Sequence, residues 1–208
     1  MRVFFLLLGL LSASFLYISF ISPTQGMDVS STIQEQHPDN AELATFAGGC
    51  FWCTESEFRT LEGVLYTRVG YEGGNLENPS YRDITTGETG HAEVLQVYFD
   101  PQIISYETLV TFFLKEAHDP TQINRQGVDV GTQYRSAIFY HDETQQKTAK
   151  KVISAIDLEG FYRSAIVTEV SPSQTFWEAE EYHQQYYEKY EEKHGKPHIR
   201  VLLKKAKK

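Results

Sequence analysis

Residues 43–60 constrain this chain most, because an expected strand, a two-glycine break and an expected helix follow one another directly. The apolar run 43–47 predicts the strand, and Gly48 and Gly49 interrupt it. Cys50 then stands at the start of the expected helix. A thiol at a helix N-terminus lies among unpaired backbone N–H groups, at the positive end of the helix dipole. That position favours the thiolate, which is the nucleophilic form of cysteine.

Cys53 is the second of only two cysteines in the chain and lies three residues after Cys50. Positions i and i+3 share one face of a helix, which puts their Cα atoms about 5–6 Å apart. A disulfide tolerates that separation. The pair therefore predicts a nucleophile and a resolving thiol that alternate between dithiol and disulfide. A static disulfide is the alternative, but it would close a very short loop and add little stability.

Phe51 and Trp52 separate the two cysteines. Aromatic side chains are costly to expose, so this pair predicts either an apolar wall beside the sulfur atoms or ordinary packing in the core. The residues by themselves leave both interpretations open.

Gly49-Cys50-Phe51-Trp52 resembles the signature of the A-class peptide methionine sulfoxide reductases. Further segments resemble the same family and follow one another in the family's order. They are Gly90-His91-Ala92-Glu93, Asp119-Pro120-Thr121-Gln122, Asn124-Arg125-Gln126-Gly127, Asp129-Val130-Gly131-Thr132-Gln133-Tyr134-Arg135-Ser136 and Glu181-Tyr182-His183-Gln184. The resemblance covers residues 43–198. Such an ordered set of motifs is far more specific than a single four-residue match.

The expected elements follow the order β-α-β-β-α-β with additions, which suits a split βαβ arrangement. Strands are expected at 43–47, 64–71, 91–99, 134–140 and 165–170, and helices at 50–60, 105–117, 142–157 and 176–193, with a short helix starting near 78–81. The resemblance implies the same fold class. It is a two-layer α/β, ferredoxin-like core with long surrounding coils and a C-terminal helical extension.

Reduction of a sulfoxide needs a thiolate that attacks sulfur and an acid that protonates the departing oxygen. The resemblance gives Cys50 the first role and Glu93 the second. Glu93 precedes Val94 and Leu95 on an apolar strand. A carboxyl buried there would have a raised pKa and hold its proton near neutral pH. The residues alone also allow a solvent-facing strand position for Glu93.

The resemblance assigns Tyr81, Asp129 and Tyr134 to the same site. It implies that the two tyrosine hydroxyls donate to the sulfoxide oxygen, and that Asp129 orients a water molecule or the substrate. Phe51 and Trp52 would cradle the methyl group and thereby select one sulfoxide epimer, the S form. Without the resemblance, the two tyrosines would be read as half-buried structural residues.

The cysteine pair predicts how the site would be recycled. Cys50 becomes a sulfenic acid, Cys53 condenses with it to a disulfide, and an external dithiol must reduce that disulfide. The resemblance implies that this reductant is thioredoxin or an exported thioredoxin-like protein. No prosthetic cofactor or metal is expected, the substrate is free or protein-bound methionine sulfoxide, and the protein is expected to be a monomer. Two departures stand out. Many relatives have Gly at position 53 with resolving cysteines near the C-terminus, and Val128 stands where Asn is common.

The N-terminus predicts export. Arg2 precedes an uncharged, mostly apolar run at 3–21, which suits a signal peptide and is nearly long enough to span a bilayer. We expect residues 1–22 to be a signal peptide or membrane anchor, 23–42 a flexible tether, and 43–208 the reductase domain. The domain would then be periplasmic or otherwise extracytoplasmic. The net charge of −9 argues against a nucleic-acid surface.

Two other functions share parts of this pattern. A thioredoxin-like thiol-disulfide oxidoreductase also carries Cys-x-x-Cys at a helix start, but no strand bearing a cis-proline is evident here. A zinc-binding module could use the two cysteines with some of the seven histidines, but no second cysteine pair accompanies them.

Overall fold

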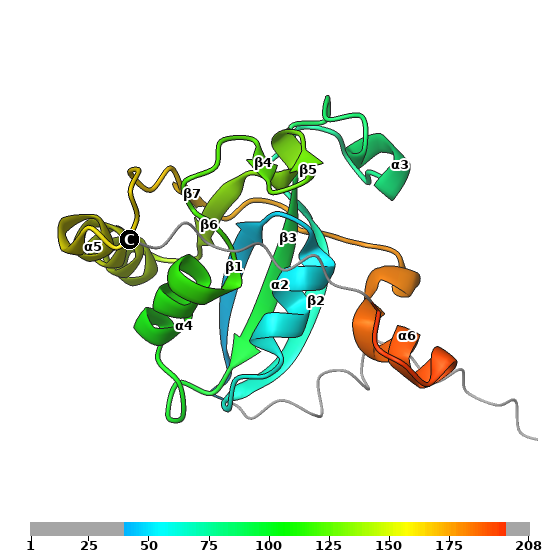
Figure 1. Cartoon of the computed structure of the whole chain (residues 1–208), viewed down its shortest axis with the longest axis horizontal. Helices are drawn as coiled ribbons and strands as arrows, with labels where there is room; N and C mark the ends of the chain where they lie inside the picture. Colours follow the sequence, from blue (N-terminus) through cyan, green and yellow to red (C-terminus); the bar gives the residue numbers. More distant parts are fainter. Residues whose placement is uncertain (1–39, 199–208) are drawn as a thin grey trace, which may run out of the picture. The chain divides into compact units, whose positions relative to one another are not determined.

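The computed structural model describes residues 40–198 (Figure 1). The expected signal peptide or anchor at 1–22 and nearly all of the expected tether at 23–42 lie outside the described residues. Within the described range, none of the helices combines the length and apolar character needed to cross a bilayer.

The described chain is built on a six-stranded sheet with the order β7-β6-β1-β3-β2-β8. The strands are β1 (Glu42–Gly48), β2 (Val64–Glu72), β3 (Ala92–Phe99), β6 (Ser136–Tyr140), β7 (Glu169–Pro172) and β8 (Trp177–Glu178). Neighbouring strands are antiparallel, except that β6 and β7 are parallel. The central order β6-β1-β3-β2, with helices after β1 and β3, is the split βαβ arrangement. The predicted fold class is therefore confirmed.

Three helices pack their apolar faces into one core on a single face of the sheet: α2 (Phe51–Phe58), α4 (Tyr106–Phe112) and α5 (Glu143–Glu159). Figure 1 shows α2 and α4 lying across the central strands. Side chains alternate between the two faces of a strand. Leu95, Val97 and Phe99 of β3 accordingly belong to the core beneath the helices, while Val94 belongs to a smaller cluster on the opposite face. Glu93 has the same parity as Leu95, so it lies on the helix-covered face.

Side-chain caps fix the starts of α3 (Tyr81–Ile84), α4 and α5. The Ser105 hydroxyl accepts a hydrogen bond from the backbone N–H of Thr108 (3.1 Å), and Asp142 caps α5. Helix α4 continues as a π-helical turn, η1 (Phe113–Ala117), so the helical stretch ends where expected. The short helix α3 is capped by Ser80.

The prediction of one helix over 176–193 was wrong. This stretch contains β8, a 3₁₀ turn η3 (Glu181–His183) and helix α6 (Tyr186–His194). The side chain of Gln184 bonds to the backbone of Val69, which ties the turn to the edge of β2 (2.9 Å from the Val69 N–H and 2.9 Å to its carbonyl). Gln185 has a left-handed backbone with φ 47°. A helix cannot run through that conformation, so α6 starts only after it.

Two strand boundaries also differ from the prediction. The strand expected at 134–140 begins at Ser136, because a 3₁₀ turn η2 (Thr132–Tyr134) precedes it. The strand expected at 165–170 lies later, at β7. The backbone N–H groups of Ile166 and Val167 bond outside the sheet, to the Asp157 carboxylate and the Pro120 carbonyl. The segment 119–132, between η1 and η2, contains a small hairpin of β4 (Arg125–Gln126) and β5 (Asp129–Val130).

Candidate active site

The turn between β1 and α2 places Cys50 at the helix start. Gly49 has a left-handed backbone (φ 88°), and a Cβ there would lie 2.5 Å from the side chain of Gln126. Only glycine fits that conformation and that close approach without strain. Cys50 is the N-cap residue, and its carbonyl accepts hydrogen bonds from the backbone N–H groups of Cys53 (3.0 Å) and Thr54 (3.3 Å).

Both cysteines are free thiols and partly exposed, so the structure represents the dithiol form. The Cys50 thiol is hydrogen-bonded to the Cys53 thiol. That bond, burial, and the negative charges that Cys53 and Glu93 carry when ionised all raise the pKa of Cys50 above its ordinary value. The backbone N–H of Cys53 acts in the opposite direction but is outweighed. The thiolate expected from the helix start alone is therefore not the resting state, because burial and the second thiol dominate over the dipole.

Glu93 is a buried acid next to Cys50. Its side chain is only 2% exposed, and its carboxyl accepts a hydrogen bond from the backbone N–H of Phe51, the first residue of α2 (3.0 Å). Burial raises the pKa of Glu93 to about 8, against the lowering effect of that hydrogen bond. At neutral pH the carboxyl is therefore mostly protonated and able to donate. Of the two positions that the sequence allowed for Glu93, the structure has the buried one.

Tyr81, Tyr134 and Asp129 approach the same place from three different segments. Tyr81 begins α3, Tyr134 ends η2, and Asp129 lies in β5. The two tyrosine hydroxyls are hydrogen-bonded to each other, and the electrostatic influence of Glu93 and Cys50 reaches both. Burial raises the pKa of Tyr81 to about 12 and raises the pKa of Tyr134 as well. Both phenols are therefore neutral donors at physiological pH. Burial also raises the pKa of Asp129.

Phe51 and Trp52 are parts of an aromatic cluster. Phe51 is 1% exposed and lies against Tyr81, with ring centroids 6.5 Å apart. Trp52 is partly exposed and stacks on Tyr186, at 3.8 Å and an interplanar angle of 9°. Its indole N–H donates to Nδ1 of His183 (3.0 Å). Burial lowers the pKa of His183, which keeps the imidazole neutral and able to accept that bond.

Glu180 is a supporting residue that the sequence analysis missed. One carboxylate oxygen accepts from the backbone N–H of Tyr81 (2.9 Å), and the other accepts from the hydroxyl of Tyr71 (2.9 Å). Glu180 thereby fixes the start of α3 relative to the sheet. Glu180 directly precedes the motif that starts at Glu181, and this was the one hint of its role in the sequence. Its partner Tyr81 lies 99 residues away, so the contact itself could not be predicted.

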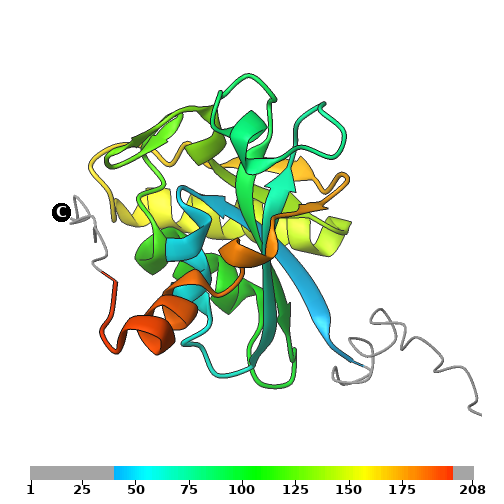
Figure 2. The ribbon, with the colours of Figure 1, turned by 90° about the vertical axis from the view of Figure 1, so that its right-hand side faces the viewer.

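Helix α6 lies beside α2, as Figure 2 shows, and it brings two more contacts that the sequence analysis missed. The hydroxyl of Tyr187 is 3.3 Å from the Sγ atom of Cys53. The buried carboxylate of Glu55, on α2, accepts hydrogen bonds from the backbone N–H (2.8 Å) and the side chain (3.2 Å) of Gln185. The sequence shows that tyrosines are frequent in 182–190. It does not show which of them contacts a cysteine.

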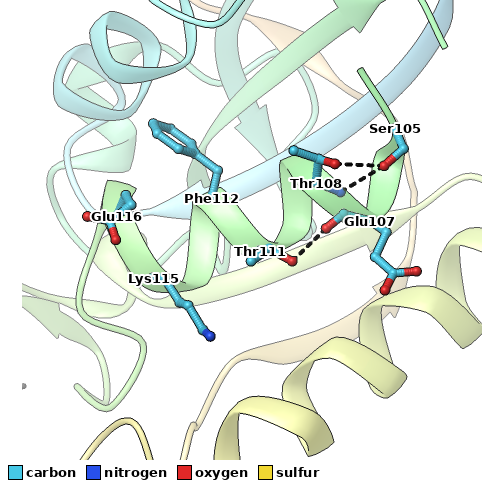
Figure 3. Close-up of a pocket in the computed structure, with 7 residues that line it drawn as sticks. All are labelled: Ser105, Glu107, Thr108, Thr111, Phe112, Lys115 and Glu116. Atoms are coloured by element: carbon cyan, nitrogen blue, oxygen red, sulfur yellow. Dashed lines mark hydrogen bonds between the residues drawn. The ribbon is translucent and has the colours of Figure 1, made fainter. Parts of the chain in front are cut away.

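A surface hollow along α4 (Figure 3) does not share this chemistry. It is lined by Ser105, Glu107, Thr108, Thr111, Phe112, Lys115 and Glu116. Two of its three charged residues form ion pairs with α5: Lys115 with Glu159 (2.8 Å) and Glu107 with Lys151 (3.1 Å). None of the predicted site residues lines it. Over residues 40–198, no group of three or more His, Cys, Asp or Glu side chains is placed to hold a metal ion.

A cysteine pair at a helix start, facing a protonated carboxyl inside a two-layer α/β core, defines a thiol-dependent oxidoreductase. The family model described as peptide methionine sulfoxide reductase matches residues 42–208. This chain belongs to that family, and it is an enzyme that reduces methionine sulfoxide.

Curated relatives and solved structures agree with this assignment. A peptide methionine sulfoxide reductase MsrA from Methanothermobacter thermautotrophicus is 55% identical over 144 residues, which is 69% of this chain and 85% of that protein. The reduced form of Mxr1 from Saccharomyces cerevisiae matches with a TM-score of 0.69 and 35% identity, covering 78% of this chain and 91% of that one.

Two further structures are also similar. Methionine sulfoxide reductase A of Corynebacterium diphtheriae has a TM-score of 0.66 and 37% identity, over 74% of this chain and 77% of that one. Mxr1 in complex with Trx2 has a TM-score of 0.51 and 30% identity, over 72% of this chain and 87% of that one.

Proposed function

We propose that the enzyme reduces the S epimer of methionine sulfoxide, with Cys50 as nucleophile and Glu93 as acid. The observation that carries this proposal is the buried Glu93 carboxyl, bonded to the backbone N–H of Phe51, the residue next to Cys50. With a pKa of about 8, it holds a proton where an oxygen would leave the substrate.

The reduction step consumes no proton from the solvent, because the numbers of protons in reactants and products are equal. The Cys50 sulfur attacks the sulfoxide sulfur, and Glu93 protonates the sulfoxide oxygen, which neutralises the charge that develops there. The S–O bond to the substrate breaks, and the oxygen passes to Cys50 as a sulfenic acid. The thiol proton of Cys50 replaces the proton that Glu93 gave up. The products are methionine and Cys50–SOH.

The neutral hydroxyls of Tyr81 and Tyr134 are suited to hold the sulfoxide oxygen on the side of Glu93. The apolar side chains of Phe51 and Trp52 are suited to contact the methyl group. A site with hydrogen-bond donors on one side and an apolar wall on the other accepts only one arrangement of oxygen, methyl and chain around a chiral sulfur. Asp129, near Glu93 and Tyr134, would orient a water molecule or the substrate backbone.

Recycling in this proposal uses Cys53 and an external dithiol. Cys53 already contacts Cys50, so it can condense with the sulfenic acid without a large movement. A thioredoxin-type protein then reduces the disulfide. The similarity to a yeast protein crystallised with Trx2 supports a partner of this kind.

Replacement of Cys53 tests this scheme. We expect the Cys53→Ser variant to release one equivalent of methionine from the S epimer and then stop, because attack on the sulfoxide needs only Cys50 and the oxygen-side groups. Wild type without reductant should instead accumulate a Cys50–Cys53 disulfide. Mass spectrometry after one turnover distinguishes the two, and the R epimer is the substrate control. A wild type that ends as a stable sulfenic acid would remove Cys53 from the mechanism.

The domain is proposed to act outside the cytoplasm, on the basis of the apolar run at 3–21. A monomer remains the expected oligomeric state. An alkaline phosphatase reporter, which matures only where disulfides form, should be active when fused after Thr45. The same fusion without residues 1–22 should be inactive, and equal activity of the two would contradict export. N-terminal sequencing of the mature protein then separates a cleaved signal from a retained anchor.

A further inference from the structure

Tyr187 places a hydroxyl against the sulfur of the second cysteine. Its oxygen lies 3.3 Å from the Sγ atom of Cys53, within hydrogen-bond range for sulfur, and its side chain is only 7% exposed. Cys53 is in turn hydrogen-bonded to Cys50. The three groups therefore form a short chain from the helix α6 to the nucleophile. The mechanism above uses the two cysteines and leaves Tyr187 without a role.

The position of Tyr187 is set by the same helix that carries Cys53. Glu55 lies two residues after Cys53 and is 1% exposed. Its carboxylate holds the backbone N–H and the side chain of Gln185, and Thr67 donates to it as well (2.9 Å). Gln185 directly precedes α6. A buried, fully bonded anchor of this kind fixes where α6 starts, and so fixes the distance between Tyr187 and Cys53.

The resolving step needs a thiolate at Cys53. In that step Cys53–SH and Cys50–SOH give the Cys50–Cys53 disulfide and one water molecule. The S–O bond breaks, the S–S bond forms, and the proton of Cys53 leaves with the hydroxide. A hydroxyl that donates to a sulfur atom stabilises negative charge on it and lowers its pKa. Tyr187 keeps its own proton throughout.

We propose that Tyr187 is a catalytic residue of the resolving step, whose hydroxyl donates a hydrogen bond to the Cys53 thiolate. The inference rests on the proposed function, in which Cys53 attacks the sulfenic acid. It also bears on recycling, where one sulfur of the disulfide must leave as thiolate. The same hydrogen bond stabilises Cys53 in that role, so an external dithiol is directed to attack the Cys50 sulfur.

Neighbouring tyrosines of α6 serve as references, because they have different partners. Tyr186 stacks on Trp52, and Tyr190 stacks on the imidazole of His194, with centroids 4.1 Å apart. Tyr190→Phe therefore removes a tyrosine hydroxyl from the same helix and keeps the ring that lies beside Tyr186 and His194. It is the matched control for Tyr187→Phe.

The test follows one turnover of a blocked methionine S-sulfoxide without reductant, in the full-length protein. We expect Tyr187→Phe to release methionine at the wild-type rate and to form the disulfide about three- to tenfold more slowly. A lost hydrogen bond to charge lowers the thiolate fraction about tenfold, and the higher intrinsic nucleophilicity of a more basic thiolate restores part of the rate. Tyr190→Phe should match wild type in both steps.

A second measurement excludes a purely structural effect. In a Cys50→Ser background, Tyr187→Phe should raise the pKa of Cys53 by about one unit, measured from the ultraviolet absorbance of the thiolate. An unchanged Cys53 pKa, or equal loss of methionine release and disulfide formation, would overturn the role of Tyr187. A wild type that releases methionine but forms no disulfide would overturn it together with the resolving role of Cys53. A wild type that releases no methionine would instead overturn the proposed function at its first step.

Discussion

The Cys50→Ser variant should release no methionine above background from either epimer of methionine sulfoxide. A serine hydroxyl has no accessible anionic form at neutral pH, and oxygen is a far weaker nucleophile toward sulfur than a thiolate is. Cys53 remains in this variant but cannot substitute, because it lies one helical turn further on and bonds to Tyr187. The measurement is methionine release with excess dithiothreitol, so that recycling does not limit the rate.

The Cys53→Ser variant is the control for this result. It keeps one thiol and removes the other, and it should still give a full first turnover. The contrast between the two serine variants therefore assigns the attack to one sulfur atom. Residual methionine release above a few per cent of the wild-type rate in Cys50→Ser would contradict the assignment of Cys50 as nucleophile.

Replacing Glu93 by glutamine should slow the first turnover on the order of 10²–10⁴-fold. The amide is nearly isosteric, can still accept the hydrogen bond from the Phe51 N–H, and can still donate to an oxygen. The amide cannot, however, transfer a proton to the sulfoxide oxygen. The loss in rate therefore measures proton transfer rather than packing. Rapid-quench measurement of methionine in a single turnover is required, because steady-state rates also include recycling.

Glu72→Gln is the matched control. Glu72 is also a fully buried glutamate at the end of a central strand, and burial raises its pKa, but it bonds to Ser173 and Gln174 instead of the start of α2. Its variant should keep a near-normal first turnover. An equal loss in both variants would show that burial of a glutamate, not its proton, matters.

The same assignment fixes a pH dependence. A carboxyl with a pKa of about 8 donates its proton only below that pH. The rate of methionine formation in a single turnover should therefore fall as the pH rises through about 8, even though a higher pH favours the Cys50 thiolate. In Glu93→Gln this fall should disappear. A wild-type rate that keeps rising well above pH 8 would contradict the acid role.

Much of this architecture follows from local patterns. The strand parity that puts Glu93 on the same face as the helices is set by Leu95, Val97 and Phe99, which are apolar at alternate positions of β3. The caps at Ser105 and Asp142 act within a few residues. The helix predicted over 176–193 failed for the opposite reason: partners far along the chain, Val69 for Gln184 and Glu55 for Gln185, determine its backbone.

The electrostatics of the cysteine pair show a similar limit. The helix-start position of Cys50 was readable from the sequence, and by itself it predicts a lowered pKa. The opposite shift comes from burial and from the Cys53 thiol, and the extent of burial depends on how the chain covers the site. The role of Tyr187 could not be predicted for the same reason, because its partner is distant in the sequence. Its contact with Cys53 spans 134 residues, and nothing local distinguishes it from Tyr186 or Tyr190.

Residues 180–187 make several hydrogen bonds to the first half of the chain, and these bonds limit insertions and deletions in this segment. Glu180 bonds to Tyr81, the first residue of α3, while Gln185 and Tyr187 bond to Glu55 and Cys53, which both lie on α2. One residue advances an extended chain by about 3.3 Å, which is more than a hydrogen bond can absorb. A single insertion or deletion here would disconnect every later partner at once. Length changes in natural or engineered variants should instead accumulate in exposed turns such as 101–103, which touch none of these contacts.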